Sequence, residues 1–181
     1  MKSKFAMAMI ASALTMPLQA ADHFSTYVDS KGTISLPKDF RSNFVHLGSW
    51  AVADQKSAAH GFHDVYTERK SVEHYRKTGK FPDGATLVKE IRKLETGPMT
   101  TGDPVHWAGG PAVWFVMIKD EKGRFPNNPQ WEDGWGWAMY KADAPMKNVA
   151  TSYRADCQTC HIPAAKTDRV FIQGYPTLKG N

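Results

Sequence analysis

Short apolar and alternating stretches dominate the chain, and this pattern favours strands over long helices. Residues 43–53 and 62–68 are rich in β-branched and aromatic side chains, as strands are. Residues 112–118 form one continuous apolar run, which is typical of a strand buried on both faces. Residues 86–95 and 135–141 fit two more strands. The pattern therefore predicts several strands in sequence.

The segments between these stretches predict few helices. Residues 71–78 fit a short helix, because Ser71 can cap its start and Gly79 follows its end. The stretch from Met146 onward fits a C-terminal helix. The remaining segments predict a turn with a short strand, a tight turn, a loop rich in Gly and Pro, and a polar connection: residues 31–37, 81–84, 97–111 and 119–134. The sum is an α+β fold, mainly antiparallel β-sheet with a few helices.

The N-terminus has the features of a secretory signal. Lys2 and Lys4 give a positive start, and the apolar stretch after them is shorter than the roughly 20 residues that span a bilayer. A small residue, Ala20, precedes the expected cleavage point. Residues 1–20 are thus predicted to be removed, which leaves residues 21–181 as a single domain outside the cytoplasmic membrane, with no membrane span.

Charge and composition add little to this picture. The formal net charge is +5, and Lys2 and Lys4 account for two of these charges. The rest is too small and too scattered to indicate a nucleic-acid partner. The chain has six Trp, six Tyr and nine Phe. These aromatic residues suit a chain that wraps a large flat cofactor, although a β-rich core would explain them almost as well.

The only two cysteines of the chain lie in one motif near its C-terminus. Cys157 and Cys160 are followed directly by His161, which gives C-x-x-C-H, the attachment sequence for haem c. The two thiols would bond the porphyrin, and the imidazole of His161 would bind the iron. A disulfide, a zinc site and a C-x-x-C redox pair are the alternatives. Zinc would need a second cluster, and a redox pair seldom lies near the C-terminus. The adjacent histidine favours haem c, and the expected C-terminal helix would carry it.

Several stretches resemble the cytochrome P-460 family, which includes the related cytochromes c′-beta. Residues 75–90 contain the pattern K-T-G-x-F-x-D-G-x-x-x-V-K-E upstream of the C-x-x-C-H motif. Further likeness lies in the segments around that motif and near the first strand: residues 36–41, 165–171 and 175–178. The resemblance implies a sheet-rich homodimer with one haem c per chain and a five-coordinate iron. P-460 proteins oxidise hydroxylamine and handle nitric oxide, whereas the c′-beta relatives bind nitric oxide or carbon monoxide.

The resemblance also assigns a special role to Lys89. In P-460 proteins a lysine is covalently joined to the porphyrin edge, and Lys89 matches its position. Its phase along the strand agrees, because Leu87 and Ile91 would lie on the same face. Lys93 shares this phase too, so a surface lysine on a half-buried strand is the alternative.

Family matching places His63 and Phe115 near the open face of the iron. Phe115 stands where hydroxylamine-oxidising members have a carboxylate, and an aromatic cap there favours a neutral diatomic ligand. His63 could supply the base that hydroxylamine oxidation needs. Asp64 and Glu90 are the carboxylates nearest in sequence to these candidate pocket residues. Other side chains that could ligate iron are Met99, Met117, Met139, Met146, His46, His60, His74 and His106.

The sequence thus predicts a periplasmic monohaem cytochrome that oxidises hydroxylamine and passes electrons to a soluble cytochrome. A c′-beta-like protein that binds nitric oxide without turnover is the first alternative. An electron-transfer cytochrome with a sixth Met or His ligand is the second.

Overall fold

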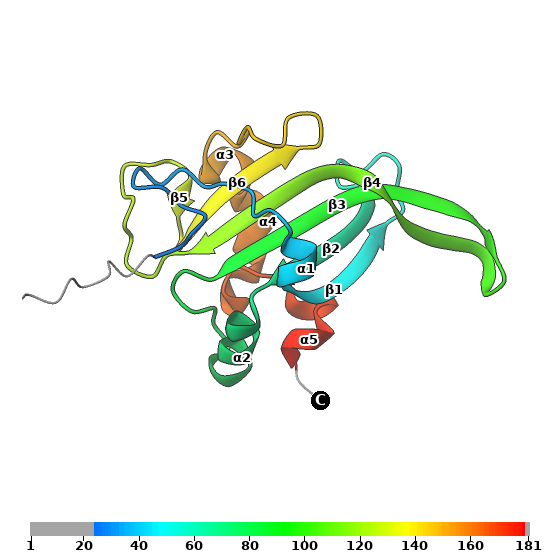
Figure 1. The fold of residues 1–181 in the computed structure, drawn as a ribbon, viewed down its shortest axis with the longest axis horizontal. Coiled ribbons are helices and arrows are strands. Elements are labelled where there is room, and N and C mark those ends of the chain that lie inside the picture. The colour runs from blue at the N-terminus through cyan, green and yellow to red at the C-terminus, as the bar shows by residue number, and fades with distance from the viewer. Residues whose placement is uncertain (1–23, 180–181) are drawn as a thin grey trace, which may run out of the picture.

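The structure is a computed structural model that describes residues 24–179, so the predicted signal at residues 1–20 lies outside the described residues. One six-stranded sheet has the order β1-β2-β3-β4-β6-β5, and every neighbouring pair is antiparallel (Figure 1). The strands are β1 Val45–Val52, β2 Gly61–Thr67, β3 Thr86–Met99, β4 Gly102–Lys119, β5 Trp131–Glu132 and β6 Trp135–Lys141. Of residues 24–179, strands hold 38% and helices 22%, which confirms the predicted α+β class.

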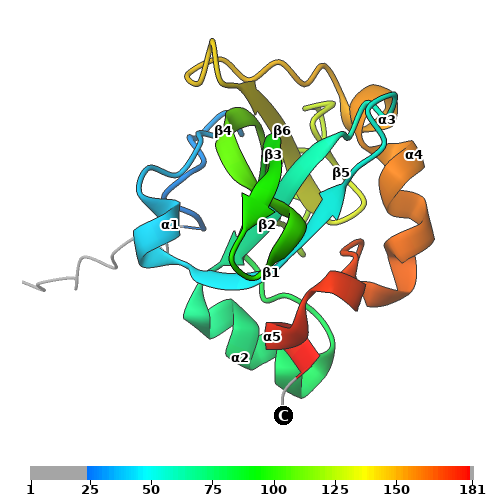
Figure 2. The same cartoon turned by 90° about the vertical axis from the view of Figure 1, so that its right-hand side faces the viewer.

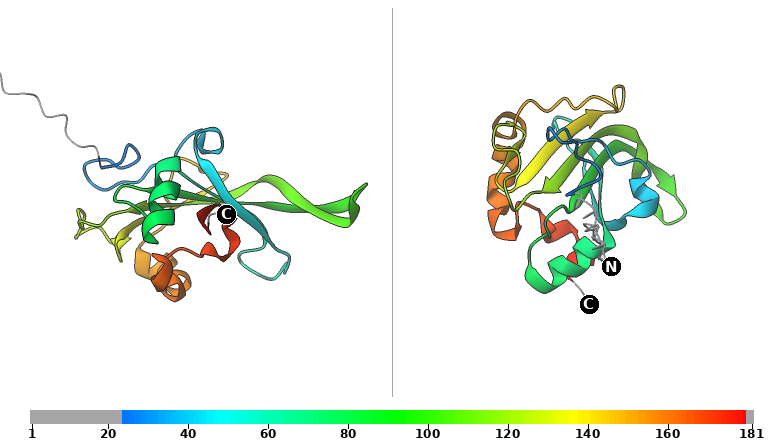
Figure 3. Two further views of the ribbon diagram at one scale, coloured as in Figure 1. Left: turned by 90° about the horizontal axis from the view of Figure 1, so that it is seen from below. Right: turned by 60° about the vertical axis from the view of Figure 1, so that its left-hand side comes forward.

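Short helices lie around this sheet. They are α1 Phe40–Asn43, α2 Arg69–Thr78, α3 Tyr153–Asp156, α4 Gln158–His161, η1 Ile162–Thr167, η2 Ile172–Gly174 and α5 Pro176–Lys179. Figure 2 shows α4 on one side of the sheet and α1 on the other. Helices α2 and α5 pack together (Figure 3), where Arg76 Nε donates to the carbonyl of Thr177 at 2.9 Å. Among residues 24–179, no helix is long and apolar enough to cross a membrane.

Both faces of the sheet are buried, each under a different part of the chain. The C-terminal residues cover one face with a cluster that includes Leu87, Trp137, Tyr153 and Tyr175. The N-terminal residues cover the other face with a cluster that includes Phe40, Val88, Trp114 and Tyr140. Because neither face meets water along the central strands, apolar residues run together there, as residues 112–118 do.

Strand β3 divides its side chains between these two faces. Leu87, Lys89 and Ile91 point toward the C-terminal segment, whereas Val88 and Glu90 point toward the N-terminal one. The predicted phase of Lys89 is therefore confirmed.

The expected Gly- and Pro-rich loop at 97–111 is wrong, because strands run through it. Residues 93–111 form a two-stranded arm that projects from the sheet (Figure 1), with pairs such as Leu94 with Ala108 and Gly97 with Val105. The pairing of β2 with β3 ends at Arg92, and that of β4 with β6 begins at Val113. Within residues 24–179, the outer edges of the arm therefore have no neighbouring strand, and Pro and Gly are tolerated at such edges.

Two expected helix starts also differ. Helix α2 begins at Arg69, and Ser71 lies buried in its first turn, where its hydroxyl donates to Glu68 at 3.0 Å. The C-terminal helix begins at Tyr153 and not at Met146. The side chain of Asn148 accepts hydrogen bonds from two backbone N–H groups, and these hold the preceding segment in an irregular path.

The expected strand at 31–37 is absent as well. Only one isolated bridge, between Val28 and Ile34, forms in that segment. The strands expected at 43–53, 62–68, 86–95, 112–118 and 135–141 are confirmed, as is the turn at 81–84, where Gly84 has a φ of 78°.

Candidate functional site

A cavity of about 800 Å³ lies between the sheet and the C-terminal segment. This volume is within the usual range for small-molecule and cofactor sites. The sheet side of the wall is mainly apolar and includes Val65, Leu87, Lys89, Ile91, Phe115, Met117 and Met139. The opposite side includes Cys157, Cys160, His161, Val170, Phe171 and Tyr175. One cavity therefore brings the motif and Lys89 to facing walls.

The two cysteines are placed by the short helices at the C-terminal side. Ser152 caps α3 by accepting from the N–H of Ala155 at 3.1 Å. Cys157 lies between α3 and α4, and Cys160 lies within α4. Both are free thiols, the first half-buried and the second exposed. The C-x-x-C-H residues thus lie on a helical segment, as predicted, although it is shorter.

The environment of these thiols weakens two of the alternatives. Burial raises the pKa of Cys157 to about 12, whereas a redox-active C-x-x-C pair needs a lowered pKa. Within residues 24–179, no group of three or more His, Cys, Asp or Glu side chains could hold a metal ion. A protein-only zinc site therefore lacks its ligands, whereas a haem brings four nitrogen ligands of its own.

His161 is oriented as an iron ligand requires. Its Nδ1 lies 2.7 Å from the carbonyl oxygen of Arg169, and this oxygen can only accept, so Nδ1 carries the proton. Nε2 is then the nitrogen left for a metal. Burial lowers the pKa of His161, which favours the neutral, ligating form. The edge of the ring meets Trp137, with 4.7 Å between ring centroids.

Lys89 lies among aromatic rings without a carboxylate partner. Its Nζ is 5.6 Å from the ring centroid of Trp50 and 5.3 Å from that of Phe115. None of the ion pairs in the described part of the chain includes it. Burial lowers the pKa of Lys89, which increases the share of neutral, nucleophilic amine. Lys93 is exposed on the same strand.

Phe115 and His63 differ in how they relate to the cavity. Phe115 is part of its wall, but His63 is not. His63 is buried, stacks on Trp50 at 4.9 Å, and its Nε2 lies 2.7 Å from the carbonyl oxygen of Ala59. Its Nδ1 has no hydrogen-bond partner in the described part of the chain. Burial lowers the pKa of His63. His63 therefore lies one layer behind Trp50 and Ala59, which do form the wall.

The two carboxylates nearest in sequence to the candidate cavity residues lie on the face of the sheet that does not line the cavity. Glu90 is paired with Arg41 and accepts from Trp114 Nε1 at 2.9 Å. Asp64 accepts from the Ser49 hydroxyl at 2.5 Å. Neither belongs to the cavity wall, because neighbours along a strand point to opposite faces. Asp156 is the carboxylate of the wall, and it accepts from Thr151 and Ser152 beside α3.

Two of the candidate methionines reach the cavity. Met117 and Met139 are part of its wall, whereas Met99 and Met146 are exposed elsewhere. The candidate histidines His46, His60, His74 and His106 are not part of the wall.

Sequence reasoning missed two features of this site. Trp50 separates His63 from the cavity, and the carbonyl of Arg169 orients His161. The aromatic position in β1 was visible in the sequence, but a backbone acceptor leaves no side-chain signal.

The model of one protein family, cytochrome P460, matches residues 37–172. The chain belongs to the cytochrome P460 family. The match covers His63, Lys89, Phe115 and the whole C-x-x-C-H motif. A comparison with curated proteins found no match. Family membership identifies a haem cytochrome, and the cavity with His161 on one wall has the size and the donor that a haem needs.

Proposed function

We propose that this P460-family cytochrome oxidises hydroxylamine in the periplasm and passes the electrons to a soluble cytochrome. Cys157 and Cys160 would hold haem c through thioethers, and His161 would bind the iron through Nε2. A haem supplies an iron that cycles between two oxidation states and binds small nitrogenous molecules. The proposal also includes a homodimer and cleavage after residue 20, as the family resemblance and the N-terminal sequence indicate.

One observation carries this proposal: the amine of Lys89, whose pKa is lowered by burial, faces the C-x-x-C-H wall across a single cavity. An amine without an ion-pair partner among the described residues can lie against the porphyrin edge, to which the matching lysine is covalently joined in P-460 proteins. Trp50 and Phe115 keep that amine desolvated from both sides. Such a bond would perturb the macrocycle, and distortion of the macrocycle is one way in which a protein tunes haem reactivity.

The test compares the wild type with Lys89→Ala and Lys89→Arg. The intact mass of the wild type should equal residues 21–181 plus one haem, and its ferrous band should lie far to the red of ordinary haem c. Both variants should keep the haem through the two cysteines but lose the red shift. Hydroxylamine oxidation should fall at least ~10-fold, which is about 1.4 kcal/mol of transition-state stabilisation.

Lys93→Ala is the matched control, because Lys93 has the same phase on β3 but lies in the exposed arm. It should leave both the spectrum and the turnover unchanged. If Lys89→Ala also leaves both unchanged, Lys89 is an ordinary strand residue. An apoprotein mass with a disulfide would refute the haem attachment itself.

A second candidate function is nitric oxide binding without turnover. The sheet side of the cavity supports it, because Phe115 caps that wall and the carboxylates Asp64 and Glu90 point away from it. A wild type that binds nitric oxide, lacks the red-shifted band and does not oxidise hydroxylamine would establish this second function.

A third candidate, electron transfer, depends on Met117 or Met139 reaching the iron, since both belong to the wall. A low-spin resting spectrum with a methionine-to-iron band would favour it. The proposed open site instead gives a high-spin resting spectrum and ready binding of carbon monoxide.

A further inference from the structure

Two consecutive residues after η1 adopt a left-handed backbone although neither is glycine. Asp168 has a φ of 58° and Arg169 a φ of 67°. This region is uncommon for residues with a side chain, and it persists where the surroundings fix it. The same 168–169 turn presents the carbonyl that accepts from His161 Nδ1 at 2.7 Å. The turn therefore determines where that acceptor lies.

The side chain of Asp168 fixes one end of the turn. Its Oδ1 lies 2.5 Å from Lys119 Nζ at the end of β4, and its Oδ2 accepts from the N–H of Phe81 at 2.8 Å. Both side chains of this ion pair are about nine-tenths buried. Lys119 also lies over the ring of Trp135, 4.9 Å from its centroid. The turn is thus attached to two parts of the sheet framework.

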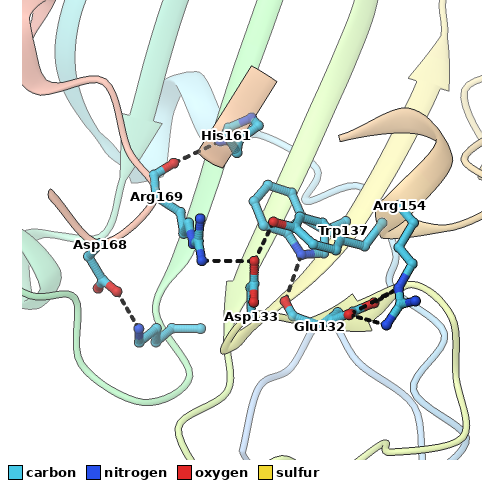
Figure 4. Close-up of polar contacts among 9 residues, drawn as sticks. Glu132, Asp133, Trp137, Arg154, His161, Asp168 and Arg169 are labelled. Carbon is cyan, nitrogen blue, oxygen red and sulfur yellow. Dashed lines mark hydrogen bonds and ion pairs between the residues drawn. The ribbon is translucent and has the colours of Figure 1, made fainter. Parts of the chain in front are cut away.

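The side chain of Arg169 fixes the other end. Its Nη2 lies 2.9 Å from Asp133 Oδ2 in the turn between β5 and β6. The same carboxylate oxygen accepts from the hydroxyl of Tyr153, a fully buried residue at the start of α3. Figure 4 shows Arg169 between Asp133 and His161, with Asp168 directed to the opposite side. This second ion pair connects the turn to the helix that leads into the C-x-x-C-H motif.

We propose that Asp168 and Arg169 are positioning residues for His161. The two ion pairs hold the turn from opposite sides, so the Arg169 carbonyl keeps a fixed distance and direction to Nδ1–H. A hydrogen bond from the ring N–H that does not face the metal orients a ligating imidazole and raises its basicity. A more basic imidazole favours the oxidised iron, so these side chains would set the reduction potential. The inference rests on the proposed ligation of iron by His161 and needs no turnover of hydroxylamine.

The test uses Asp168→Gly and Arg169→Gly in the haem-loaded protein. Glycine adopts a left-handed backbone without steric cost, and both variants retain the carbonyl of residue 169. Each variant therefore removes one ion pair while it keeps the turn and the acceptor. We expect the iron–histidine stretching frequency of the ferrous protein to fall and the reduction potential to rise, because a less fixed acceptor leaves a less basic imidazole.

Arg154→Gln is the matched control. It removes another Arg–carboxylate pair beside the same β5–β6 turn, with Arg154 Nη2 2.8 Å from Glu132 Oε1, but this pair is exposed and does not touch the 168–169 turn (Figure 4). It should leave frequency and potential at wild-type values. Wild-type values in both glycine variants would overturn the proposal.

Asp133→Asn decides the case if the glycine variants fail to incorporate haem. It removes the charge that pairs with Arg169 but keeps an oxygen for the Tyr153 hydroxyl, and it should likewise lower the iron–histidine frequency and raise the reduction potential. A wild-type result for this variant would overturn the role of Arg169. A wild type with an iron–histidine band but no hydroxylamine oxidation would overturn only the proposed function.

Discussion

Lys89 and Lys93 lie on the same strand with the same phase, yet one is surrounded by apolar side chains and the other by solvent. Lys89 lies in the cavity wall between two aromatic rings, and burial lowers its pKa, whereas Lys93 is exposed beyond the last pairing of β2 with β3. The phase of a strand fixes which face a side chain occupies. Only the extent of the covering segments decides whether that face is dry. The residue pattern therefore identified the face, and the fold separated the two lysines.

Phe115 gives a testable prediction at this scale. Hydroxylamine oxidation removes protons with electrons, and none of the described residues on the sheet side of the cavity is a carboxylate that could accept these protons. A positioned general base typically contributes on the order of 10²-fold or more. We expect Phe115→Glu to raise hydroxylamine turnover toward that factor, while Phe115→Gln, of similar size without a base, does not. Steady-state turnover at matched haem content is the measurement. Equal rates in both variants would show that proton removal does not limit the reaction.

Asp83 predicts a pH dependence of stability. Hydrogen bonds from Arg124 lower the pKa of Asp83, and Nη2 lies 2.6 Å from Oδ2. Because the folded pKa is below the unfolded value near 3.8, the contribution is present above that value and is lost as the pH falls below it. Asp83→Asn should lower the free energy of unfolding at pH 7 by about 1–2 kcal/mol.

Denaturant unfolding of the haem-loaded protein at several pH values measures this effect. The difference between wild type and Asp83→Asn should shrink as the pH falls through the carboxylate range. Asp143→Asn is the control, since Asp143 is exposed and forms none of the described ion pairs. A difference that stays constant with pH would show that the charge of Asp83 is not its source.

At the scale of elements, the sequence correctly predicted the strands whose residue pattern reflects burial against a covered face. The five expected strands are present. They were predictable because the covered faces of the sheet require apolar side chains at regular positions along each strand. The arm was missed, because an edge without a neighbour accepts Gly and Pro that would interrupt an inner strand. The start of the C-terminal helix was misplaced, because tertiary hydrogen bonds to Asn148 outweigh local preference. The missed acceptor of His161 is a backbone atom, which no residue type reveals.

Gly48 gives the prediction at this scale. The strand β1 passes so close to η2 that a Cβ on residue 48 would overlap the carbonyl oxygen of Gly174. This close contact fixes the position of the segment that brings Tyr175 to the cavity wall. Gly48→Ala should therefore lower the free energy of unfolding by roughly 1–3 kcal/mol, as overpacking does. It should also lower the fraction of the protein that incorporates haem.

Gly110→Ala is the matched control, because a Cβ there would meet nothing within 4 Å. Its effect on denaturant unfolding should stay within about 0.5 kcal/mol of wild type. If Gly48→Ala is equally mild, the C-terminal segment can move away from β1 at little cost, and its position does not depend on this close approach.

At the scale of the whole molecule, the arm and the cavity are separate. The cavity wall extends along the sheet to Ile91 and Val113, just before the arm of residues 93–111 begins. A two-stranded ribbon is marginally stable by itself in water. The arm nevertheless exposes Met99 and Trp107, with 46% and 37% of their surface accessible. These features suit an arm that packs against a second copy of the chain in the proposed homodimer.

The last prediction follows from this separation. Trp107→Glu should convert the proposed dimer to a monomer, because a charge placed in an apolar interface lacks a partner, while the haem spectrum should stay unchanged. Sedimentation velocity combined with absorption at the haem band measures both in one experiment.

Met146→Glu is the control, since Met146 is 83% exposed and lies outside the arm. A wild type that sediments as a monomer, or a Trp107→Glu variant that remains a dimer, would show that the arm serves another purpose. A changed haem spectrum in Trp107→Glu would show that arm and cavity are coupled through β3 and β4, the two strands that they share.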